Sequence, residues 1–119
     1  MKPSVLVTHE ECLQHVTPPG HPEQVARLEY ILEALKDINL SRVSAPMAAE
    51  DDILRIHPRE HINYLQDAVP DTGFKSIDGD THISSGSLTA AYRAAGGVLR
   101  AVDLVLSGEA KNAFVAVRP

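Results

Sequence analysis

The chain has 119 residues and a net charge of −5 with its histidines neutral, and 44% of its residues are hydrophobic; without an internal repeat, this length predicts a single domain over residues 1–119. It has no cluster of lysine or arginine and no long apolar stretch, which excludes nucleic-acid and membrane partners and a signal peptide. The single cysteine, Cys12, cannot form an internal disulfide, so we expect a reducing, cytoplasmic location.

Strands and helices are predicted to alternate in the first half of the chain. Residues 4–9 are rich in β-branched side chains and predict a buried strand. Pro22 suits the first position of an amphipathic helix of about four turns. The apolar side chains of this helix recur every three or four residues: Val25, Leu28, Ile31, Leu32 and Leu35. Residues 40–45 predict a second strand, and two short helices are expected at 50–56 and 58–68.

The second half is predicted to contain an irregular segment, the longest helix and a final strand. Residues 70–86 are rich in Asp, Gly, Ser and Thr and predict irregular chain, and a helix then runs from Ser87 to a stop at Gly108. Its predicted apolar stripe consists of Leu88, Ala91, Ala95, Val98, Leu99, Val102, Val105 and Leu106. The glycines at 96–97 favour close approach of this helix to a sheet. Residues 112–117 are apolar on both faces, as in a central parallel strand, so the element order indicates an α/β layered fold.

Two histidine patterns invite a metal-site hypothesis. His57 and His61 are four residues apart, which places two ligands on one face of a helix. Pro58 lies between them and starts the helix expected at 58–68, which leaves His57 at or before its cap. No Glu or Cys nearby supplies a third ligand, so surface or capping histidines are favoured over a metal site. His9-Glu10 resembles the start of a zinc-protease motif, but Leu13 stands where its second histidine belongs.

Other polar residues leave alternatives open. The cluster at 78–82 is typical either of turn chemistry, in which Asp side chains bond nearby N–H groups, or of a functional site. Arg27 either pairs with Glu23 four residues earlier or binds an anion. Cys12 is favoured as an inert thiol, and residues 84–87 as helix-capping chain.

Four blocks of the sequence, taken together, point to a known family. They are Gly20-His21-Pro22-Glu23 with Arg27; Ile56-His57 leading to Tyr64-Leu65; Asp78-Gly79-Asp80-Thr81 leading to Ala94-Ala95-Gly96-Gly97; and Ser107-Gly108-Glu109 with residues 111–119. In this order and spacing the chain resembles the histone deacetylase, acetoin utilisation and acetylpolyamine amidohydrolase family, especially its class II and bacterial members. The resemblance implies a three-layer α/β/α fold with a parallel sheet, the arginase/deacetylase-like fold, truncated to its first strands and helices.

The resemblance also implies a chemistry and its missing parts. Members of this family use zinc to activate water for hydrolysis of N-acetyl amides. They continue from the equivalent of Arg118-Pro119 into a Pro-Gly-His-His sequence that supplies acid/base catalysis, and the zinc ligands follow later. We therefore expect an N-terminal segment of a zinc-dependent deacetylase with no catalytic residue, metal ligand or cofactor of its own, inactive by itself.

Four residues are carried over from the resemblance. Asp80 is similar to the family's rim aspartate, which binds and orients the substrate backbone. Arg27 is similar to the basic residue that lines an internal channel below the active site. His21 and Pro18 resemble first-loop residues near the pocket wall.

Two alternatives remain for what such a segment does. It is either a stand-alone binding or self-associating module, or one half of a split deacetylase completed by a separate chain. The expected partner is a second copy or the missing C-terminal portion, bound through the exposed sheet edge at residues 112–117. A completed enzyme would take acetyl-lysine or an acetylated small molecule.

Overall fold

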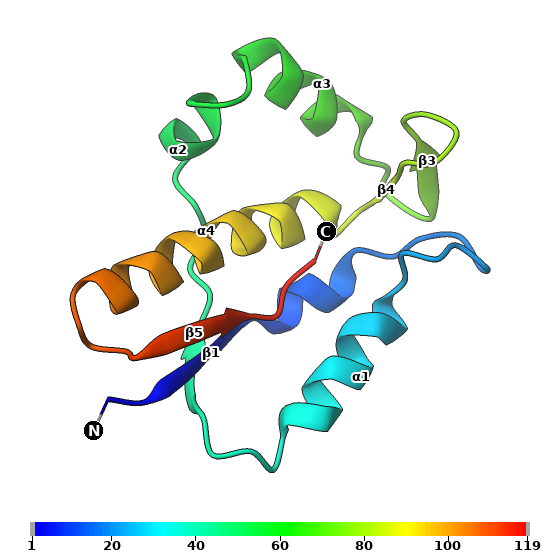
Figure 1. Ribbon diagram of the computed structural model, residues 1–119. Coiled ribbons are helices and arrows are strands. Elements are labelled where there is room, and N and C mark those ends of the chain that lie inside the picture. The colour runs from blue at the N-terminus through cyan, green and yellow to red at the C-terminus, as the bar shows by residue number, and fades with distance from the viewer. Residues whose placement is uncertain (1, 119) are drawn as a thin grey trace.

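The computed structural model describes residues 2–118, which form a layered α/β fold (Figure 1). Three parallel strands pair in the order β2-β1-β5, with β1 at Ser4–Thr8, β2 at Ser41–Ser44 and β5 at Asn112–Val115. Helix α1 (Val25–Leu35) covers one face of this sheet, and helix α4 (Ser87–Leu106) covers the other. The predicted α/β/α layering around a parallel sheet is confirmed.

Strand β1 lies in the middle of the sheet and carries the core. Val5 and Val7 point to one face, where they pack in a cluster with Leu104 of α4. Leu6 points to the other face and packs with Leu28 of α1. A strand covered on both faces needs a continuous apolar run, so the buried strand predicted at residues 4–9 is confirmed.

Strand β5 has one strand neighbour within residues 2–118. It pairs with β1, in register Leu6 to Phe114, and the side chain of Phe114 is largely exposed. The apolar run at 112–117 is typical of a central strand, whereas β5 forms an edge of the described sheet. This is the exposed edge that the sequence led us to expect there.

Helix α1 begins later than predicted, at Val25 with Gln24 as its N-cap residue. The expectation that Pro22 starts the helix is wrong. The peptide N–H of Glu23 donates to the ring of His21, and the carbonyl of Glu23 accepts a hydrogen bond from the hydroxyl of Thr17. These contacts hold Pro22 and Glu23 in the loop that precedes the helix.

The segment 70–86 is more regular than predicted, because it contains a small antiparallel hairpin. Strand β3 (Phe74–Ser76) pairs with β4 (His82–Ser84), and residues 77–81 form the turn between them. The side-chain oxygen Oδ1 of Asp78 accepts the N–H groups of Asp80 and Thr81, each at 2.8 Å. Turn chemistry of this kind closes a hairpin whose strands are too short to show a clear alternating pattern.

Helix α4 turns a different face toward the sheet from the one predicted. Its buried side chains are small or lie at the helix end, and the outer part of the predicted stripe is exposed. The buried positions are Ser87, Ala90, Gly96, Gly97, Ala101 and Leu104; the exposed apolar ones are Val98, Leu99, Val102, Val105 and Leu106. A Cβ atom at Gly96 would lie 2.0 Å from the carbonyl oxygen of Pro46, and one at Gly97 would lie 3.1 Å from Ala45 Cβ. Close approach at these glycines, as predicted, decides which face packs.

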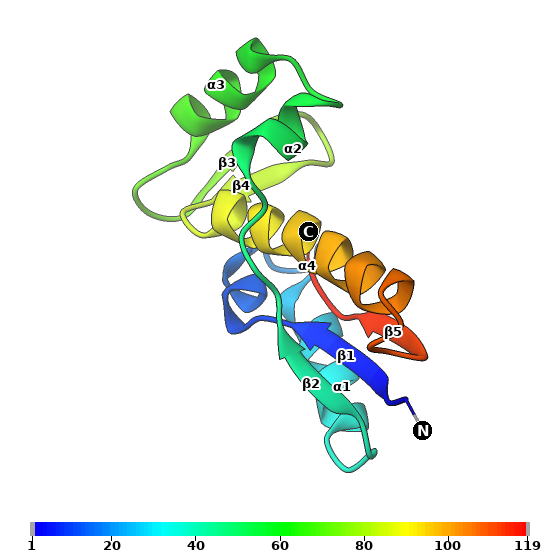
Figure 2. The ribbon, with the colours of Figure 1, turned by 90° about the vertical axis from the view of Figure 1, so that its left-hand side faces the viewer.

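Two short helices lie on the far side of α4 from the sheet (Figure 2). They are α2 (Glu50–Leu54) and α3 (Arg59–Ala68), close to the predicted bounds. A short 3₁₀ helix, η1 (Glu10–Gln14), follows β1 and contacts α4. None of the helices within residues 2–118 is long and apolar enough to cross a bilayer.

Candidate functional site

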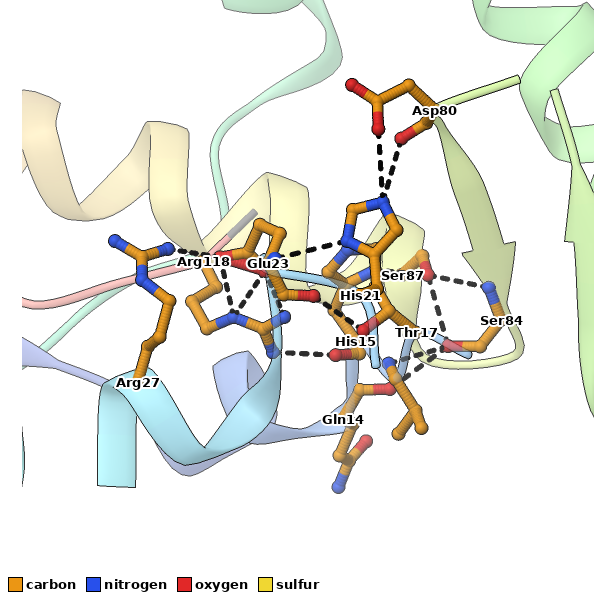
Figure 3. A network of polar contacts seen from close by, with 11 residues as sticks. Gln14, His15, Thr17, His21, Glu23, Arg27, Asp80, Ser84, Ser87 and Arg118 are labelled. Atoms are coloured by element: carbon orange, nitrogen blue, oxygen red, sulfur yellow. Dashed lines mark hydrogen bonds and ion pairs between the residues drawn. The ribbon is translucent and has the colours of Figure 1, made fainter. Parts of the chain in front are cut away.

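Polar side chains gather beyond the carboxyl ends of β1 and β5, which is the usual location of sites in parallel sheets. Here the first loop (residues 15–24) meets the hairpin, the start of α4 and the segment after β5 (Figure 3). A pocket of about 290 Å³ opens between them. Its wall is formed by His15, Thr17, His21, Glu23, Leu65, Ile77, Asp80, Thr81, His82, Ile83, Ser87, Leu88 and Ala91.

Arg118 joins the end of β5 to the first loop. Its side chain is only 3% exposed. The Nε atom lies 2.9 Å from Oε2 and 3.1 Å from Oε1 of Glu23, and Nη2 donates to Oε2 as well. The Nη1 atom donates to the carbonyl oxygen of His15 at 2.6 Å. A planar guanidinium is suited to such forked contacts with a carboxylate.

Glu23 is the centre of this charge network. Its carboxylate also accepts a hydrogen bond from Nη1 of Arg27 at 2.7 Å. The hydrogen bond from Arg118 is the main reason that the pKa of Glu23 is lowered. Glu23 is therefore ionised at neutral pH, and its negative charge compensates the buried guanidinium.

His15 is buried in the pocket wall, where its pKa is lowered. Burial lowers its pKa first, and the nearby charge of Arg118 lowers it further. The ring Nδ1 lies 2.7 Å from the hydroxyl of Ser87, which accepts the N–H of Ser84 at 2.7 Å. The segment 84–87, expected to cap the helix, does supply its N-cap residue, Gly86, but without a side-chain hydrogen bond, and Ser87 is buried.

His21 and Asp80 face one another at the mouth of the pocket. The Nε2 atom of His21 lies 3.0 Å from the main-chain oxygen of Asp80 and 3.5 Å from its Oδ1. The carboxylate of Asp80 is 94% exposed, whereas the ring of His21 is 15% exposed. The pKa of Asp78 is lowered, mainly by the hydrogen bond from the N–H of Asp80. The turn chemistry considered for residues 78–82 is thus present, and it does not use the Asp80 carboxylate, which stays exposed to solvent.

The four residues carried over from the sequence resemblance are only partly brought together. His21 and Asp80 both line the 290 Å³ pocket. Pro18 does not line it; its carbonyl accepts the N–H of His21 at 3.1 Å. Arg27 is 58% exposed, pairs with Glu23, and borders a separate hollow of about 80 Å³ between α1 and the end of β5.

The metal that the resemblance implies does not fit the residues present. Within residues 2–118, no three or more His, Cys, Asp or Glu side chains come together in an arrangement able to hold an ion. His57 and His61 stack with ring centroids 5.0 Å apart on the surface, at the start of α3. Cys12 is fully buried next to Leu6.

Four members of this network were not predicted from the sequence: Arg118, Glu23 as its ion partner, His15 and Ser87. One signal could have found the first two. Arg118 directly follows an apolar strand, and Glu23 precedes an apolar helix. A charged residue at the end of a buried strand needs a counter-charge near the same edge. His15 and Ser87 left no such signal, because neither carries a fixed charge whose burial would demand a partner.

Comparison with known proteins relates most of the chain to one family. The family described as "Histone deacetylase domain" matches residues 21–119. A probable deacetylase of Archaeoglobus fulgidus is 35% identical over 96% of the chain and 33% of its own length. A histone deacetylase-like amidohydrolase of Pseudomonas aeruginosa is 38% identical over 87% of the chain and 29% of its own length. The chain therefore spans about a third of the length of these relatives.

A solved structure supports the same fold. The crystal structure of the HDA15 HD domain superimposes with a TM-score of 0.89 over 99% of the chain and 35% of that structure. Its sequence identity is 23%, so this likeness concerns the fold alone.

Proposed function

Because the chain belongs to the histone deacetylase family, we propose that residues 1–119 supply the substrate-orienting wall of a zinc-dependent deacetylase. One observation carries this proposal. The carboxylate of Asp80 is exposed at the pocket mouth, while its main chain is bonded through its N–H to Asp78 and through its carbonyl to His21. A free acceptor on a fixed backbone is what orienting a substrate requires.

The substrate class follows from that acceptor and from the family. An N-acetylated amine, either acetyl-lysine in a peptide or an acetylated small molecule, would enter the pocket with its N–H groups near Asp80. A carboxylate accepting such N–H groups forms charge-assisted hydrogen bonds, each contributing about 1.5–3 kcal/mol. On the opposite side of the pocket, the buried guanidinium of Arg118 binds the partly exposed carboxylate of Glu23 in the first loop.

The metal is held elsewhere in this proposal. Zinc would supply an activated water and polarise the acetyl carbonyl, and a catalytic zinc site takes three protein ligands. Residues 2–118 do not group such a set. We therefore expect residues 1–119 alone to hydrolyse no acetylated substrate. Either a continuous chain or a separate C-terminal chain would complete the enzyme, in a reducing cytoplasm that suits the free thiol of Cys12.

The test is a fusion of residues 1–119 to the part of the Archaeoglobus relative that follows the aligned region. In this enzyme, Asp80→Asn removes the charge and keeps the shape. We expect about a tenfold or greater loss in kcat/KM for an acetyl-lysine peptide, since one charge-assisted bond is lost. Asp71→Asn is the matched control, because Asp71 is an exposed residue near the start of the same segment, 70–86. This change should leave kcat/KM unaltered. Equal activity of the two variants would refute the role of Asp80.

A second candidate function, self-association, is favoured by the exposed apolar face of α4. Five large apolar side chains there are exposed, and Phe114 is exposed on the edge strand β5. Contiguous apolar surface and unpaired strand edges are typical of interaction sites. Sedimentation should show a dimer or larger assembly that Val102→Glu disperses. A parent chain that stays monomeric at high concentration would exclude this candidate.

A further inference from the structure

We propose that His21 is a positioning residue, which holds Asp80 in place through one fixed tautomer of its imidazole ring. The part held is the rim turn, residues 77–81. The inference rests on the proposed function for the meaning of Asp80. The anchoring of the rim turn by His21 depends only on contacts between the first loop and the hairpin.

Two hydrogen bonds of His21 require the same tautomer. The peptide N–H of Glu23 donates to Nδ1 of His21 at 3.1 Å, so Nδ1 carries no proton. The Nε2 atom lies 3.0 Å from the carbonyl oxygen of Asp80, which can only accept, so Nε2 carries the proton. The N–H of Glu23 in the first loop thereby leaves the ring proton on Nε2, and Nε2 donates it to the rim turn.

The base and the tip of the hairpin are fixed by different residues. At the base, the hydroxyl of Ser84 accepts the N–H of Val16 at 3.0 Å and donates to the carbonyl of Gln14. At the tip, Asp78 shapes the rim turn from within. In the described part of the chain, the bond from His21 is the hydrogen bond that joins the first loop to the rim turn. The ring of His21 also meets that of His82 edge to face, with centroids 5.3 Å apart.

The chemistry of the contact leaves Asp80 available. His21 binds the carbonyl oxygen, and the carboxylate Oδ1, at 3.5 Å, lies beyond a good hydrogen bond. The ring thus fixes the backbone of Asp80 without neutralising its carboxylate. An orienting group must be held to within about 0.5 Å to be effective. A hairpin that is fixed only at its base would leave the rim turn too mobile for this.

The experiment uses the 119-residue chain and two substitutions. Nitrogen-15 NMR of the His21 ring should show an unprotonated Nδ1 and a protonated Nε2 at neutral pH. His21→Phe keeps a ring against His82 but removes the donor, so amide exchange at Asp80 and Thr81 should accelerate about three- to tenfold. His21→Gln offers an amide N–H in place of Nε2 and should restore exchange to within about twofold of the parent.

Amides of β1 and α4 are the internal control and should exchange as in the parent. A proton on Nδ1, or unchanged exchange at the rim turn in His21→Phe, would overturn the proposal. Should His21→Phe fail to fold, the proposal is still tested by the tautomer of the parent and by amide exchange at the rim turn in His21→Gln. In the fused enzyme, an inert Asp80→Asn change would refute the proposed function while leaving a measured His21 anchor intact.

Discussion

Replacing Arg118 tests how the carboxyl end of β5 is tied to the first loop. Arg118→Met keeps a long, flexible side chain but removes the guanidinium that donates to Glu23 and to the carbonyl of His15. Removing one partner of a buried ion pair costs about 3–5 kcal/mol. Glu23 is one-third exposed and retains Arg27, so water and that second cation compensate part of the loss. We expect the free energy of unfolding to fall by about 3 kcal/mol.

The matched control uses the same carboxylate. Arg27 contacts Glu23 at 2.7 Å but is more than half exposed, so Arg27→Met should lower the free energy of unfolding by about 0.5 kcal/mol or less. Urea unfolding followed by far-UV circular dichroism suits a chain without tryptophan. Equal losses for the two variants would refute the reasoning that burial, rather than pairing, sets the contribution of Arg118.

Two further predictions concern acid stability and helix packing. His15 and Glu23 both have lowered pKa values in the folded chain, so the unfolded chain binds more protons in acid. Urea midpoints should be constant above about pH 7 and decrease as the pH falls below the usual histidine pKa near 6.5. They should decrease again as the pH falls below about 4.5. A midpoint that rises on acidification would contradict this sign. Gly96→Ala places a Cβ against the carbonyl of Pro46, so the free energy of unfolding should fall by about 1–3 kcal/mol despite the better helix propensity of alanine. Gly79→Ala, which meets nothing within 4 Å, is the control, and equal stability of the two variants would argue against close packing at Gly96.

The layered fold could be predicted because its elements carry strong local patterns. The apolar run at residues 4–9 and the spacing of Leu28 and Leu32 follow the periods of a strand and a helix. The face that α4 turns toward the sheet could not be predicted, because a stripe of large apolar side chains ordinarily marks the buried face of a helix. There the glycines let the backbone approach the sheet, so small residues are buried and Val102 is exposed.

The site was predictable only where neighbouring residues build it. The Asp78 turn can be read from four consecutive residues, since its bonds are local. The pairing of Glu23 with Arg118 joins residues 95 positions apart, and it depends on the register of β1 and β5. The sequence indicates that a charged residue at the end of a buried strand needs a counter-charge. Nothing local in the sequence fixes the register that decides which residue supplies it.

The most direct test of the central claim is a paired measurement of zinc content and deacetylation for residues 1–119 and for the fused enzyme. We predict that the 119-residue chain retains no stoichiometric zinc and releases no acetate from an acetyl-lysine peptide, while the fusion does both and loses its activity with a chelator. Tight zinc binding and chelator-sensitive turnover in the 119-residue chain would contradict the claim that these residues orient the substrate while residues outside 1–119 bind the zinc.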